Sequence, residues 1–97
     1  MAELLERIRP SVNRQRLLDT AVRLVAVPSR TGEAGAALEA LAEILTADGF
    51  AVQREAACHP TAPAVLVRLD SGNPGRTLQF NGHLDTVHLP FAPPTVE

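Results

Sequence analysis

The chain has 97 residues, of which 45% are hydrophobic and 21% charged, and its formal net charge is -2. This balance predicts one small globular domain, and it argues against intrinsic disorder and against a basic nucleic-acid footprint. A domain of this length hides only about 60–65% of the surface of its unfolded chain, which excludes a large enclosed active site built from this chain alone.

Helical periodicity dominates the first quarter of the chain. Residues 1–10 predict a short helix that Pro10 interrupts, because proline lacks a backbone donor. From about Ser11, apolar residues recur at three- and four-residue steps, which predicts an amphipathic helix. This helix is expected to end at Val27-Pro28, since the residue before a proline avoids the α region.

A second amphipathic helix is predicted over residues 33–48. Thr31 is the expected N-cap, and Glu33 in the first turn suits the positive end of the helix dipole. Gly49 stands where a left-handed residue commonly ends a helix, and Phe50 is placed to fold back onto Leu45. The end of this helix is therefore marked more clearly than its start.

After Gly49 the pattern changes from helical to extended, and strands are expected at residues 51–55, 64–69 and 77–81. The turn-forming residues 70–75 predict that the second and third strands pair as a hairpin. The proline-rich residues 89–94 predict an extended loop. The expected fold class is α/β, with two amphipathic helices plus about three strands and no linker that divides the chain.

Features that the sequence lacks indicate the cellular compartment of the protein and exclude some classes of binding partner. Cys58 is the only cysteine, so the chain cannot form an internal disulfide and a reducing compartment is expected. Residues 1–10 lack the unbroken apolar run of a signal peptide, and no stretch of about 18 apolar residues could cross a membrane. A cytoplasmic protein with no nucleic-acid or membrane partner is therefore expected.

Polar residues on alternate positions after Gln79 suggest metal chemistry. In extended backbone, His83 and Asp85 share one face, where the carboxylate can hydrogen-bond one imidazole nitrogen and leave the other for a metal. By itself this spacing is weak evidence. A strand-end histidine followed by a solvated aspartate in a turn explains it as well.

The wider string at residues 81–87 reads NGHLDTV. It resembles the first metal-binding signature of the dinuclear-zinc amidohydrolase and exopeptidase family, which includes acetylornithine deacetylase, succinyl-diaminopimelate desuccinylase, aminoacylase and glutamate carboxypeptidase. Residues 24–33 resemble the helix of that family that ends in a Pro-Ser turn. Both matches occur in the family's order, and the elements between them agree, so the resemblance covers nearly the whole chain.

This resemblance implies the N-terminal part of a zinc-exopeptidase-like catalytic domain, whose strands belong to a larger mixed sheet. Residues 1–97 would form a single partial domain without a lid or dimerisation domain. The implied activity is zinc-dependent hydrolysis of an amide bond in an N-acyl amino acid or short peptide, of deacylase, desuccinylase or carboxypeptidase type. His83 corresponds to a zinc ligand, and Asp85 to the active-site acid that holds the histidine ring.

Complete members of the family bind two zinc ions, for which cobalt could substitute, and the full-length protein could form a homodimer. The bridging aspartate, the catalytic glutamate and the distal histidine of the family have no counterpart that can be placed in this sequence. The isolated chain is therefore expected to be inactive. The alternative is a non-catalytic α/β remnant or interaction module that pairs through an exposed sheet edge.

Other reactive side chains have simpler explanations. Cys58, His59 and His88 could join a metal site, but their spacing matches no recognisable zinc pattern. Cys58 is expected to be a partly buried small hydrophobe, and the two histidines to be surface or loop-packing residues. The less favoured alternative for His88 is a place at the mouth of an active-site pocket. Ser29 lacks a nucleophile elbow and is expected to order its turn, and Arg30 is expected to be solvated.

Overall fold

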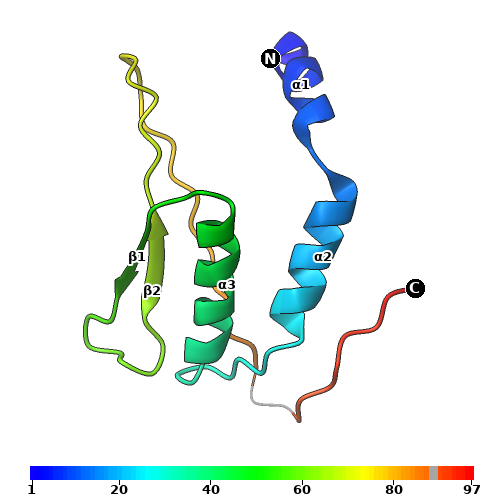
Figure 1. Cartoon of the computed structure of the whole chain (residues 1–97), viewed down its shortest axis with the longest axis vertical. Helices are drawn as coiled ribbons and strands as arrows, with labels where there is room; N and C mark the ends of the chain where they lie inside the picture. Colours follow the sequence, from blue (N-terminus) through cyan, green and yellow to red (C-terminus); the bar gives the residue numbers. More distant parts are fainter. Residues whose placement is uncertain (88–89) are drawn as a thin grey trace.

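The computed structural model describes residues 1–87 and 90–97, and it combines helices with a small antiparallel sheet (Figure 1). The helical elements are α1 (Ala2–Ile8), the 3-10 helix η1 (Arg9–Ser11), α2 (Arg14–Val25) and α3 (Gly35–Ala47). They are followed by strands β1 (Val52–Glu55) and β2 (Ala64–Val67). This mixed helix-and-strand content agrees with the expected α/β class.

Local signals account for the N-terminal helices. Pro10 lies at the start of η1. The first N–H groups of a helix have no acceptor within the helix, so the missing N–H of proline costs no hydrogen bond there. The side-chain oxygen of Asn13 accepts the backbone N–H of Arg16 at 3.0 Å and caps α2. Because of this cap, α2 begins at Arg14 and not at Ser11 as the periodicity alone predicts.

The C-terminus of α3 is a Schellman motif. Gly49 has a φ of +91°, and its N–H donates to the carbonyl of Thr46 at 3.0 Å. The N–H of Phe50 donates to the carbonyl of Leu45, also at 3.0 Å. Both bonds satisfy carbonyls that would otherwise lack a partner, which confirms the predicted helix end.

A tertiary contact holds the N-terminus of α3, and the prediction of Thr31 as N-cap is wrong. Ala34 occupies the cap position and offers no side-chain hydrogen bond. The N–H of Gly35 instead donates to the carbonyl of Thr61 at 3.0 Å, and the Thr61 hydroxyl donates to the carbonyl of Gly32 at 2.6 Å. The hydrogen-bond acceptor at this helix end therefore comes from a loop about 30 positions downstream and not from a local N-cap side chain.

Strands β1 and β2 pair antiparallel, with Val52 opposite Val67 and Glu55 opposite Ala64. The predicted third strand at 77–81 is wrong, because residues 76–85 form no strand and the second and third segments do not pair. The side chains of Leu78 and Phe80 are 77% and 89% exposed. An alternating segment becomes a strand only when a neighbouring strand pairs with it and one face is covered, and here neither condition is met.

Helix α3 lies between the sheet and α2 (Figure 1). Ion pairs join it to both neighbours: Arg54 on β1 contacts Glu39 at 2.6 and 2.8 Å, and Arg23 on α2 contacts Glu43 at 2.8 Å. Hydrogen bonding to Arg54 holds the pKa of Glu39 below its ordinary value. These ion pairs connect α3 to the sheet and to α2. Arg16 and Asp48 form a further ion pair between α2 and the end of α3.

The core of the described residues consists of small side chains, namely Ala34, Ala37 and Ala42, with buried Ser29 beside them. The chain exposes 8426 Å², whereas a folded monomer of 10.3 kDa is expected to expose about 5,400 Å². Its radius of gyration is 15.9 Å, against about 12.5 Å for a compact domain of this length. Much of the apolar surface therefore finds no partner within the chain.

Among residues 1–87 and 90–97, no helix has the length and apolar character needed to cross a bilayer.

Candidate metal-binding site

The segment that carries His83 and Asp85 is docked against the turn that follows α2. The N–H of Thr86 donates to the carbonyl of Ser29 at 2.7 Å, and the N–H of Thr31 donates to the carbonyl of Thr86 at 3.2 Å. These bonds form an isolated parallel bridge between Arg30 and Thr86. Residues 24–33 and 81–87, the two stretches that carry the family resemblance, therefore lie side by side.

The imidazole of His83 is held by Asp85. Nδ1 of the ring lies 2.8 Å from the Asp85 carboxylate oxygen Oδ1 and 3.1 Å from the Asp85 main-chain oxygen. Because both oxygens accept, Nδ1 is the donor, and in the neutral imidazole Nε2 is then the nitrogen with a free lone pair. This hydrogen bond is the one that the His-x-Asp spacing predicted, although it forms in irregular backbone and not in a strand.

Thr31 is a further member of the site that the sequence did not identify. Hydrogen bonding from its side chain, and then from the His83 ring, lowers the pKa of Asp85 below the ordinary value of 3.8. The Thr31 hydroxyl also lies 3.3 Å from the main-chain oxygen of Thr86. No local pattern could reveal this role, because Thr31 and Asp85 meet only when the two segments dock.

The exposure of the two side chains suits a ligand and its supporting residue. The His83 side chain is 85% exposed, and that of Asp85 is 32% exposed. The ring can therefore reach a metal in solvent through Nε2, while the partly covered carboxylate fixes the orientation of the ring. The residues fit one ligand position for zinc.

The remainder of a metal site is absent from the described residues. Within 1–87 and 90–97, no three His, Cys, Asp or Glu side chains are grouped closely enough to hold a metal ion. A catalytic zinc takes three protein ligands and an open position. Within the part of the chain that the structure describes, His83 therefore belongs to no set of three ligands.

The three other residues considered as metal ligands do not join His83 in the described part of the chain. Cys58 is exposed, so the expectation of a partly buried thiol is wrong. His59 lies in the loop between β1 and β2, where its N–H donates to the carbonyl of Ala56 at 2.8 Å. His88, expected to be a surface or loop-packing residue, lies outside the described residues.

A groove of about 430 Å³ adjoins the site. The end of α2 and the turn after it form one side, residues 83–87 another, and residues 90–92 of the C-terminal segment a third. Arg30 lines this groove with its side chain 56% exposed, so it is solvated as expected but also faces the candidate site. Its guanidinium Nε lies 3.9 Å from the Glu33 carboxylate, which is beyond hydrogen-bonding distance.

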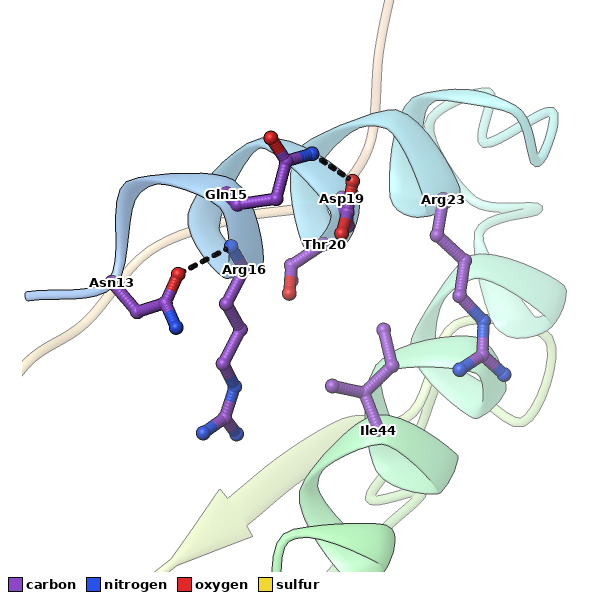
Figure 2. Close-up of a pocket in the computed structure, with 7 residues that line it drawn as sticks. All are labelled: Asn13, Gln15, Arg16, Asp19, Thr20, Arg23 and Ile44. Carbon is purple, nitrogen blue, oxygen red and sulfur yellow. Dashed lines mark hydrogen bonds between the residues drawn. The ribbon is translucent and has the colours of Figure 1, made fainter.

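A second pocket, of about 340 Å³, lies between α2 and α3 (Figure 2). Arg16, Arg23 and Ile44 line it, together with polar residues of α2. Both guanidinium groups are already paired with carboxylates of α3, and Gln15 donates to Asp19 at 2.8 Å. This pocket is therefore an ion-paired helix boundary and not a reaction site.

No family model, no curated protein and no solved structure matches the chain. The functional proposal therefore depends on the residues and their geometry.

Proposed function

We propose that the chain is part of the catalytic domain of a zinc-dependent hydrolase that cleaves an amide bond in an N-acyl amino acid or short peptide. The observation that carries this proposal is the 2.8 Å contact between His83 Nδ1 and the Asp85 carboxylate. It selects the tautomer in which Nε2 is the metal-binding nitrogen. The docking of residues 81–87 on the turn after α2 supports the same assignment.

Each residue of the pair has a distinct role in this proposal. Asp85 keeps the proton on Nδ1 and fixes the ring plane, and Thr31 helps to keep Asp85 ionised. His83 would hold zinc through Nε2. When bound, the metal supplies Lewis-acid polarisation of the scissile carbonyl and a water with a pKa of about 7.

The surface of the chain supports a role within a larger folded unit. The accessible area exceeds that of a compact monomer of the same mass by more than half. Leu17 on α2 and the segment with Leu78 and Phe80 present their side chains to solvent. In the proposed enzyme, further structure would cover these apolar residues and add the missing ligands, while the 97 residues alone would not hydrolyse substrate.

Zinc titration by calorimetry at pH 7 tests the proposal on the chain itself. We expect weak binding of a single zinc ion that His83→Ala abolishes, while the matched variant His59→Ala leaves it unchanged. If His83→Ala binds zinc as tightly as the wild-type chain, the assignment fails. In a longer protein that contains these residues, normal turnover by His83→Ala would also refute it.

The second candidate function is an interaction module that recruits a partner strand. The sheet has only two strands, so each strand has one edge without a neighbour in the sheet. This function predicts association without zinc, because partner strands would pair with these edges. Sedimentation of the zinc-free chain separates the two candidates, since the hydrolase proposal needs no association through these edges.

A further inference from the structure

We infer that Asn81 is a modification site, at which the side-chain amide is converted to a carboxylate through a cyclic imide formed with the backbone nitrogen of Gly82. The reaction needs neither an enzyme nor a metal, so the inference goes beyond the proposed function. Its observations are the exposure of both residues, the irregular backbone around them and the open space at Gly82.

The reacting groups of this modification are adjacent in the sequence. The amide nitrogen of Gly82 attacks the side-chain carbonyl carbon of Asn81, a C–N bond forms, and the side-chain nitrogen leaves as ammonia. Water then opens the resulting succinimide at one of its two carbonyls, which gives either aspartate or isoaspartate. The net reaction consumes one water, releases one ammonia and adds one negative charge to the formal net charge of -2.

The fold leaves this ring closure unobstructed. Asn81 and Gly82 are both exposed, and the backbone here forms neither helix nor strand (Figure 1). In the described part of the chain, the Gly82 N–H donates to no backbone carbonyl. A Cβ at Gly82 would meet no atom within 4 Å, and glycine itself has none to hinder the attack.

The two other asparagines of the chain are matched comparisons. Asn73 precedes Pro74, whose nitrogen carries no proton and cannot close the ring. The side-chain oxygen of Asn13 accepts the backbone N–H of Arg16 at 3.0 Å, and this cap holds the Asn13 amide in place. Of the three asparagines, Asn81 therefore has the sequence and the surroundings that the reaction needs.

The Asp48-Gly49 pair is a further comparison, because an Asp-Gly sequence closes the same ring with loss of water. The N–H of Gly49 donates to the carbonyl of Thr46 at 3.0 Å within the Schellman motif. Ring closure at Gly49 would have to break this bond, whereas Gly82 has no such bond to a backbone carbonyl in the described residues. Folding is therefore expected to protect Asp48 and not Asn81.

The modification adds charge beside the proposed metal ligand. Two residues of chain span at most about 7 Å, so the new carboxylate lies close to His83. A negative charge at about that distance, screened by salt and solvent, should tighten zinc binding about twofold. This consequence rests on the proposed function, whereas the modification itself does not.

The test is incubation of the full chain at neutral pH, followed by ammonia release and by peptide mapping with mass spectrometry. We expect conversion of Asn81 at rates equal within about twofold in the folded chain and in guanidinium, because exposed irregular segments open at almost no free-energy cost. Isoaspartate at Asp48 should accumulate only in guanidinium. Gly82→Ala should slow the conversion severalfold, whereas Asn73→Gln should leave it unchanged. Much slower conversion in the folded chain, an unchanged rate in Gly82→Ala, or equal conversion at Asn73 and Asn81 would overturn the inference.

Zinc binding separates this inference from the proposed function. Asn81→Asp reproduces the new charge without the longer main chain of isoaspartate, and Asn73→Asp is the control of equal net charge. Zinc should bind about twofold more tightly to Asn81→Asp than to Asn73→Asp, and equal affinities would refute the effect on the metal ligand. A chain that converts Asn81 but takes up no zinc would support the modification site and refute the hydrolase. Zinc binding that depends on His83, in a chain whose Asn81 stays unmodified, would support the metal ligand and overturn the inference.

Discussion

The left-handed end of α3 offers a stability test whose magnitude can be worked from the structure. Gly49 has a φ of +91°, and the Schellman bonds from Gly49 and Phe50 both depend on this conformation. A Cβ added at this position would meet no atom within 4 Å. The cost of Gly49→Ala is therefore conformational and not steric.

A non-glycine residue in the left-handed region costs about 1–2 kcal/mol. The reduced freedom of alanine in the unfolded chain returns about 0.4–1 kcal/mol. We therefore expect a net loss of about 1 kcal/mol in the free energy of unfolding. For a domain of about 100 residues this corresponds to a fall of roughly 4–8 °C in the melting temperature.

Thermal unfolding followed by circular dichroism at 222 nm measures this change. Gly82→Ala is the matched control, because its Cβ would also find open space but its φ lies outside the left-handed region. The control should change stability by less than about 0.5 kcal/mol. Equal melting temperatures for wild type and Gly49→Ala, or equal losses in both variants, would refute the assignment of the helix end to backbone conformation.

Three further predictions concern the docked loops. Gly35→Ala would place a Cβ 3.0 Å from the backbone oxygen of Thr61, so the Thr61 loop must give by a few tenths of an ångström. Urea unfolding should show a loss of about 1 kcal/mol, and an unchanged midpoint would contradict the close approach. The Asp85 carboxyl should titrate below its ordinary value of 3.8, and Thr31→Val should raise the midpoint toward 3.8 in carbon-detected magnetic resonance. Because folding lowers this pKa, the ionised carboxylate stabilises the fold above pH 3.8, and this contribution is lost as the pH falls below that value. A measured midpoint above 3.8 would mean that the ionised carboxylate destabilises the fold. Asp85→Asn should weaken zinc binding at His83 by about 10–100-fold in calorimetry, and undiminished affinity would exclude the orienting role.

Predictions that depend on short-range patterns agree with the structure. The interruption at Pro10, the amphipathic α2 and the Gly49 helix end each follow from residues a few positions apart. The hydrogen bond from His83 to Asp85 belongs to the same class, because the two residues are separated by only one position. Such contacts depend mainly on residues that are close together in the sequence.

Two predictions did not agree with the structure, because contacts with distant parts of the chain, or their absence, decided the outcome. The alternation around Phe80 predicted a strand, but nothing pairs with this segment or covers its apolar face. Thr31 was expected to cap α3, whereas Gly35 receives its acceptor from Thr61. Local propensity favoured a strand in the first case and a side-chain cap in the second, but the tertiary contacts of the folded chain support neither.

The sequence by itself determined the helices, the C-terminal end of α3, the α/β class and the His-x-Asp pair, because these depend on periodicity, caps and side chains within a few residues. Only the tertiary structure decided which strands pair, that Thr31 supports Asp85 and that Arg30 faces the groove. The last two features depend on Thr86 hydrogen bonding to residues 29 and 31, about 55 positions earlier. Contacts of that range are set by the closure and packing of the whole chain, which no local pattern contains.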